Sequence, residues 1–389
     1  MKHIAGSLLA MVLATGCAVA PLAPPPSSLF KDDLFAAPST RVSADEVFAL
    51  SDEMRRFLRV QIADDLIAKG SRQALFDSLY AKSQLKLDYE TRVTRNAAET
   101  YAARAGNCLS LVIMTAAFAK ELNLPVRYQQ AVNVDTWSRA GNVQYFVGHV
   151  NVTLGPRSTE SRLTEFGASR LGSDQMTIDF LPPAETRGMS TRVVDEKTIV
   201  AMFMNNRAVE MFVRGNLDDA YWWARGAITQ SPQFLSSYNT LGVIYQRHGN
   251  LPEAETALAF GLGRDPANTR LMLNLASVLE GQGRVAEAQV LSRKLQQLEP
   301  DPPFQYLNQG MAALRRGDYQ SARDLFAREV QRAPTNDEFR YWLAVASVGL
   351  GDIESARYEL AKALEYSSTR QDHDIYAAKL ARITHGTPP

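Results

Sequence analysis

The stretch Arg104-Ala105-Gly106-Asn107-Cys108-Leu109-Ser110-Leu111 places a cysteine directly before an apolar run that extends to Leu124. This run predicts a buried helix that begins near Cys108. A thiol at a helix start lies close to backbone N–H groups without intrahelical partners and to the positive end of the helix dipole, and both stabilise a thiolate. The stretch therefore indicates a nucleophilic cysteine. The alternative is a buried cysteine that packs as a small apolar side chain.

The composition is that of a globular protein without a nucleic-acid partner. The chain has 389 residues, enough for two or three domains. Lys+Arg and Asp+Glu each number 42, so the net charge is zero, and no dense basic run occurs beyond the N-terminus. Hydrophobic residues make up 46% and charged residues 22%, which predicts well-buried cores rather than disorder.

The N-terminus is typical of a signal peptide. A short basic start, Met1-Lys2-His3, precedes an apolar stretch from Ile4 to Leu13 that is too short to span a bilayer stably. The small residues Ala14-Thr15-Gly16 before Cys17 resemble a bacterial lipobox, in which the cysteine is lipidated. Cleavage after Ala20 is the alternative. The sequence thus predicts a lipoprotein signal peptide over residues 1–17.

Residues 18–40 are rich in proline and serine and have no apolar period, so they predict an extended tether between a lipid anchor and the folded body. Ala18 differs from the aspartate that is associated with inner-membrane retention, which favours the outer membrane, facing the periplasm. If Cys17 carries lipid, Cys108 has no disulfide partner within the chain.

Residues 41–195 combine helices and strands. Amphipathic periods predict helices over 44–69, 73–81 and 96–103, ahead of the Cys108 helix. Alternating patterns with β-branched residues then predict strands over 126–134, over 143–147 and 148–154, either paired or continuous, and over 177–181. The helix that carries the cysteine therefore comes before strands that carry His149 and Asp179.

Thiol catalysis requires a base that accepts the thiol proton near neutral pH, and imidazole suits that role. Of the histidines after the signal peptide, only His149 lies in the same domain as Cys108. A carboxylate would orient the imidazole ring, and Asp179 is the best candidate, with Asp174 and Asp135 as alternatives. The backbone N–H of Cys108 is a natural oxyanion donor, but the sequence identifies no second donor.

These motifs together resemble the transglutaminase-like superfamily over roughly residues 85 to 185: Gly106 to Leu111, Gly148 to Val152, and Ile178-Asp179-Phe180. The resemblance implies a papain-like α+β fold in which Cys108 is the nucleophile, His149 the base and Asp179 the orienting carboxylate. It favours a protease or amidase over a cross-linking enzyme. The chain departs from the family pattern because Phe180 and Leu181 follow the aspartate, where proline is usual.

From about residue 200 the sequence repeats every 34 residues. Alanines stand at 220, 254, 288, 322 and 356, and prolines at 232, 266, 300 and 334. This period, with small residues where helices cross, is the tetratricopeptide (TPR) pattern. It predicts an all-α solenoid over residues 201–385, with repeats at 201–234, 235–268, 269–302, 303–336 and 337–370 and a capping helix from Ile375 to Ile383.

The first helix of each repeat carries a polar residue at an equivalent position, and these residues are Asn206, Thr240, Asn274 and Asn308. Asn205 and Asn239 are their neighbours in the sequence. By similarity to peptide-binding TPR domains, Asn206, Asn239, Asn274 and Asn308 are predicted to hydrogen-bond an extended peptide on the concave face. The alternative is a row of solvated polar residues.

The sequence favours no cofactor. It contains no His-Glu-x-x-His or Cys-x-x-Cys spacing for a metal and no glycine-rich phosphate loop before a helix. Two hypotheses follow. The first is a cell-envelope thiol enzyme that cleaves a protein or peptide amide and recruits its substrate or partner through the TPR array. The second is a scaffold lipoprotein in which the transglutaminase-like domain only docks.

Overall fold

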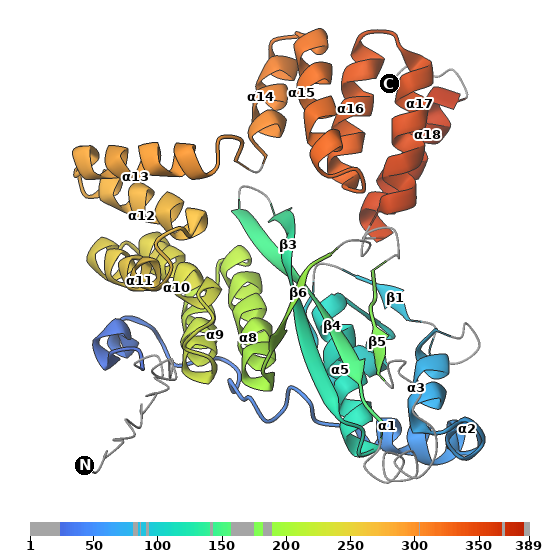
Figure 1. Ribbon diagram of the computed structural model, residues 1–389. Helices are drawn as coiled ribbons and strands as arrows, with labels where there is room; N and C mark the ends of the chain where they lie inside the picture. Colours follow the sequence, from blue (N-terminus) through green and yellow to red (C-terminus); the bar gives the residue numbers. More distant parts are fainter. Residues whose placement is uncertain are drawn as a thin grey trace, which may run out of the picture.

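The computed structural model describes residues 24–80, 85, 87–90, 93–140, 143–156, 175–181, 189–302, 304–367 and 370–384. Within this part of the chain, a region of mixed helices and strands precedes a long array of paired helices (Figure 1). The predicted signal peptide and its lipidation site Cys17 lie outside the described residues.

The helices that precede the cysteine are short. Two 3-10 turns (Ser27–Leu29 and Asp32–Leu34) come first, followed by α1 (Asp52–Arg56), a π-helical turn (Phe57–Gln61), α2 (Ala63–Lys69), α3 (Ser71–Tyr80) and α4 (Ala97–Ala103). Helix α4 begins where predicted because Asn96 and Glu99 form a reciprocal capping box. The predicted helix over 44–69 is instead divided: Ile62 leaves helical geometry between the π-helical turn and α2.

A four-stranded antiparallel sheet follows α5 (Cys108–Glu121). Its order is β5-β4-β3-β6, with bounds β3 (Val126–Ala140), β4 (Val143–Leu154), β5 (Met176–Ile178) and β6 (Thr191–Val194). The two predicted segments at 143–147 and 148–154 form the single strand β4. A separate parallel pair joins β1 (Asp88–Tyr89) to β2 (Ala105–Gly106), immediately before α5. Helix α5 contacts β4 and is buried from Cys108 to Ala119.

The predicted all-α solenoid is confirmed. It consists of α8 (Glu196–Val213), α9 (Leu217–Gln230), α10 (Ser236–His248), α11 (Leu251–Arg264), α12 (Thr269–Gly281), α13 (Val285–Leu298), α14 (Gln305–Arg315), α15 (Tyr319–Arg332), α16 (Asp337–Gly349), α17 (Ile353–Tyr366) and α18 (Arg370–Thr384). The turn inside each repeat needs a residue with positive φ, and glycine supplies it at 34-residue intervals, as at Gly249 (φ 94°) and Gly283 (φ 79°).

The hydrophobic core does not follow the division of the chain into two domains. One continuous cluster runs from Leu29 through α5 and the sheet to Ala288 in α13. A separate cluster begins at Phe304. Accordingly, α8 to α13 share one core with the sheet, which α8 contacts at β3, whereas α14 to α18 form a second stack (Figure 1). The array is therefore divided between α13 and α14, although the 34-residue period of the sequence continues through this point.

Part of the predicted tether lies against the helix array. The ring of Phe35 stacks on that of Tyr221 with centroids 4.1 Å apart, and Arg225 pairs with Asp32 at 2.9 Å. Ser39 donates its backbone N–H to the Asp219 carboxylate at 2.7 Å. Ring stacking on Tyr221 and the bond to the Asp219 carboxylate thus hold this segment on α9. The hydroxyl of Tyr245, which donates to the Leu29 carbonyl at 3.0 Å, holds it on α10.

Candidate active site

Cys108 is the first residue of α5 and is 4% exposed. Asn107 caps the helix: its side-chain oxygen accepts the backbone N–H of Ser110 at 2.9 Å. Gly106 is needed because a Cβ there would lie 2.7 Å from the Cβ of Ser110. The absence of a side chain at Gly106 therefore lets the nucleophile loop pack tightly against the first turn of the helix.

His149 lies on β4 with its ring facing the cysteine. Its Nδ1 is 3.3 Å from the Cys108 Sγ, and its Nε2 is 2.9 Å from Oδ2 of Asp179. The histidine is 3% exposed. The structure thus brings together the three residues that the sequence singled out.

Asp179 directly follows β5, whose antiparallel register with β4 pairs Thr177 with Thr153. Side chains two residues further along then share a face, so Asp179 lies beside Asn151 and near His149. Asn151 donates its Nδ2 to Asp179 at 3.1 Å, and the backbone N–H of Leu181 donates to Asp179 at 3.0 Å. Leu181, part of the departure from the family pattern, therefore supplies a bond that orients the carboxylate. Of the two alternatives, Asp174 lies outside the described residues and Asp135 lies in β3 opposite Gly148.

The electrostatics favour a protonated imidazole. Burial disfavours the charged ring, but hydrogen bonds to Asp179 and Cys108 outweigh it and raise the pKa of His149 to about 9. Burial also opposes the charge of Asp179, yet the bonds from His149 and the Leu181 N–H hold the pKa of that carboxyl below its usual range. At neutral pH a cation therefore lies beside the sulfur, and a cation there stabilises a thiolate.

Sequence reasoning missed Tyr89. Its hydroxyl lies 3.1 Å from the Cys108 Sγ. The parallel pairing of β1 with β2 aligns Tyr89 with Gly106 and so holds the tyrosine beside the nucleophile loop. A strand of two residues leaves no periodic signal in the sequence, and no local pattern could have identified this residue.

Helix α8 of the first repeat is bonded to the nucleophile loop. The hydroxyl of Thr94 accepts both Asn107 Nδ2 at 3.0 Å and Asn206 Nδ2 at 3.2 Å. The backbone N–H of Thr94 donates to Glu210 at 2.6 Å, and burial raises the pKa of that carboxyl. The Thr94 hydroxyl therefore links Asn107, which caps the cysteine helix, to Asn206 in the helix array.

The four asparagines predicted to bind a peptide occupy three different settings. Asn206 is bonded to Thr94, as above. Asn274 donates to Asn239 at 2.7 Å across α12 and α10. Asn308 is exposed on α14, in the second stack. The division of the array at α13 separates Asn308 from the other three.

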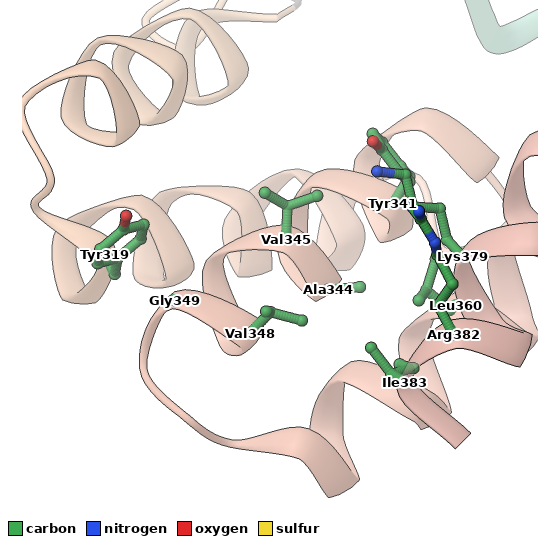
Figure 2. Close-up of a pocket in the computed structure, with 10 residues that line it drawn as sticks. All are labelled: Tyr319, Tyr341, Ala344, Val345, Val348, Gly349, Leu360, Lys379, Arg382 and Ile383. Carbon is green, nitrogen blue, oxygen red and sulfur yellow. The ribbon is translucent and has the colours of Figure 1, made fainter. Parts of the chain in front are cut away.

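The second stack contains a pocket of about 360 Å³ between α16 and α18 (Figure 2). Tyr341, Val345 and Val348 line it from one face of α16, and Leu360 contributes from α17. The opposite wall, on α18, carries Lys379, Arg382 and Ile383. One wall is therefore apolar, and the other adds two cationic side chains.

The described part of the chain offers neither a metal site nor a membrane span. No group of three His, Cys, Asp or Glu side chains there could hold a metal ion. Among the same residues, no helix is both long enough and apolar enough to cross a bilayer.

Comparison with known proteins identifies the helix array. Residues 239–302 and 307–372 match the family model described as tetratricopeptide repeat, so the C-terminal region is a TPR solenoid. No curated protein matches the chain.

Several solved TPR structures resemble about half of the chain. The thermophilic TPR protein TTC0263 of Thermus thermophilus is 19% identical, with 46% of this chain and 99% of that chain covered and a TM-score of 0.31. PilF of Pseudomonas aeruginosa is 18% identical, with 49% and 87% covered and a TM-score of 0.30. YrrB, described as a TPR protein with an unusual peptide-binding site, is 20% identical, with 46% and 92% covered and a TM-score of 0.25.

Proposed function

We propose that this chain is a thiol hydrolase that cleaves a protein or peptide amide, with Cys108 as nucleophile, His149 as acid and base, and Asp179 as the orienting carboxylate. The observation that carries the proposal is the unbroken series of contacts from Sγ through both ring nitrogens to the Asp179 carboxylate, at 3.3 and 2.9 Å. The order of these residues, on a helix and then on strands, supports the resemblance to the transglutaminase-like superfamily and its papain-like fold.

The reaction follows from this geometry. The Cys108 thiolate attacks the carbonyl carbon, a C–S bond forms, and the carbonyl π electrons move to oxygen. The Nδ1–H of His149 then protonates the leaving nitrogen as the C–N bond breaks, which leaves a thioester. Water, deprotonated by the now neutral His149, attacks the thioester carbonyl and the C–S bond breaks, which releases the acid product and restores the thiolate and the imidazolium.

The proposal includes a location. Lipidation of Cys17 would anchor the protein, and Ala18 favours the outer membrane with the folded part in the periplasm. Residues 29–39 lie on α9 and α10, so only a short segment would separate the lipid from the helix array.

A small activated ester tests the chemistry without knowledge of the natural substrate. The wild-type chain should release p-nitrophenolate from p-nitrophenyl acetate in a burst followed by turnover, and intact-protein mass spectrometry should place the acetyl group on Cys108. The Cys108→Ala variant should show neither. A wild-type chain that never forms the thioester would contradict the proposal.

The family match, which is confined to the TPR region, favours a second candidate: an adaptor that acts by binding alone. Complementation separates the two candidates. An adaptor requires that Cys108→Ala restore the phenotype of a deletion strain, whereas the hydrolase requires that this variant fold normally and fail to restore it.

We place the binding of a peptide partner at the pocket between α16 and α18. The apolar wall of Tyr341, Val345 and Val348 suits an apolar side chain, and Lys379 and Arg382 opposite suit a neighbouring carboxylate. The volume of about 360 Å³ is in the range of ligand sites. The partner class is therefore an acidic peptide with an apolar anchor residue.

Fluorescence anisotropy with labelled peptides, in which Leu, Ile, Phe or Met precedes two glutamates, checks this site. We expect Lys379→Glu to weaken binding of the best peptide about tenfold or more, because it replaces attraction by repulsion. Lys197→Glu makes the same charge change on α8 and should have no effect. Peptides in which two lysines replace the two glutamates are the control for charge. If they bind with equal affinity, or if none of the four acidic peptides binds, the assignment is contradicted.

A further inference from the structure

The oxyanion formed at Cys108 needs hydrogen-bond donors, and the helix start supplies one, the backbone N–H of Cys108. We propose that the hydroxyl of Tyr89 is the second donor. This inference rests on the proposed function, because it assigns a catalytic role within the same thiol reaction. The observation behind it is the 3.1 Å contact between the Tyr89 hydroxyl and the Cys108 Sγ.

The backbone holds Tyr89 in place. On either side of it, the N–H of Asp88 donates to Arg104 at 2.8 Å and the N–H of Glu90 donates to Gly106 at 3.1 Å. Arg95 secures the same pair of strands, since its guanidinium reaches Glu90 at 2.8 Å and the Ala105 carbonyl at 3.3 Å. A donor fixed in this way needs little reorganisation during the reaction, which is the requirement for stabilising a developing charge.

Of the two side chains that contact the sulfur, Tyr89 is the more exposed. Tyr89 is 38% exposed, whereas His149 is 3% exposed. We therefore expect the carbonyl group of a substrate to approach Sγ from the side of the tyrosine, which would bring its oxygen near the Tyr89 hydroxyl.

The hydroxyl can follow the charge as it moves. In the proposed reaction the attacking sulfur carries the negative charge. When the C–S bond forms, the electrons of the carbonyl π bond pass to oxygen, and sulfur becomes a neutral thioether. The Tyr89 hydroxyl then exchanges its bond to sulfur for a bond to the oxyanion, and it returns when the C–N bond breaks and the thioester carbonyl reforms. The interaction is strongest in the transition state, as catalysis requires.

Two reagents separate this role from a simple effect on the thiolate. Acylation by p-nitrophenyl acetate passes through an oxyanion, whereas alkylation by iodoacetamide displaces iodide at a saturated carbon and forms none. In the full chain, Tyr89→Phe should lower the acylation rate constant about 100-fold, the loss typical of one oxyanion donor. It should leave the alkylation rate largely unchanged. Tyr358→Phe, which alters an exposed tyrosine on α17, is the matched control and should change neither rate.

The outcomes are distinct. Equal losses in both rates would mean that Tyr89 acts on the thiolate, and no loss in either would mean that it has no role; both results overturn the inference while leaving the proposed function in place. A wild-type chain that is alkylated but never acylated would overturn the proposed function and this inference with it.

Discussion

His149→Gln should lower the turnover of the acyl-enzyme about 1,000-fold, within the range for loss of a general acid and base. The reason is that His149 makes both the 3.3 Å contact with Sγ and the 2.9 Å contact with Asp179, so the variant loses the proton carrier and the cation at once. Stopped-flow measurement of p-nitrophenolate release gives the burst and the turnover separately. His248→Gln, on the exposed end of α10, is the matched control.

The pH dependence gives a second readout of the same residue. Acylation by an amide substrate needs the imidazolium as the acid that protonates the leaving nitrogen, so the rate of amide cleavage should fall as pH rises through about 9, the pKa of His149. Alkylation by iodoacetamide needs only the thiolate and should not fall there. In His149→Gln the alkylation rate should instead rise steadily with pH. A variant that keeps wild-type alkylation at pH 7 would contradict the assigned dyad.

The raised pKa of His149 also affects stability. A folded-state pKa of about 9, above the ordinary 6.5, favours the folded state fully below pH 6.5, and the contribution is lost as pH rises through 9. The difference in free energy of unfolding between wild type and His149→Gln should therefore shrink in that interval.

Removal of the helix array should unfold the thiol region. A fragment of residues 24–195 lacks α8, which carries six large buried apolar side chains: Ile199, Val200, Met202, Phe203, Met204 and Met211. Helix α8 packs on α5 and β3 as well as on α9 and α10, so part of this burial covers the thiol region. Each such side chain is worth about 1.5–3 kcal/mol when fully buried, and the roughly 5–15 kcal/mol that stabilises a typical domain leaves little reserve against its loss. The fragment also loses the bonds of Thr94 to Asn206 and Glu210.

A longer fragment provides the control. Residues 24–302 retain the whole continuous core, which ends at Ala288. We expect a single cooperative thermal transition for 24–302 and none for 24–195, measured by circular dichroism and calorimetry. A cooperative transition for 24–195 would show that the thiol region is independent of the solenoid.

Much of this arrangement was predictable because its signals are local. The 34-residue period of alanine and proline predicted the helix pairs, since each repeat needs the same small residues and turns. The apolar run after Cys108 predicted α5, and alternation around His149 predicted β4. Residue chemistry then selected Cys108, His149 and Asp179 from few candidates, and the structure places them in contact. Their catalytic roles remain predictions.

Other features were not readable because they depend on contacts between distant residues. Nothing near Tyr89 indicates that a two-residue strand pairs beside Gly106. Asn206 has the same residue type as Asn274, yet it meets Thr94 instead of another repeat. The period of the sequence passes through residues 299–304 without change, although the packed core is divided there.

By itself, the sequence determined α5, β4, the TPR register and the three residues of the candidate site, because helical, strand and repeat periods are set by neighbouring residues. Only the tertiary structure decided that Tyr89 reaches the sulfur, that α8 completes the core of the thiol region and that the array is divided at α13. These depend on how whole helices and strands pack, and packing is settled by shape and burial across the entire chain.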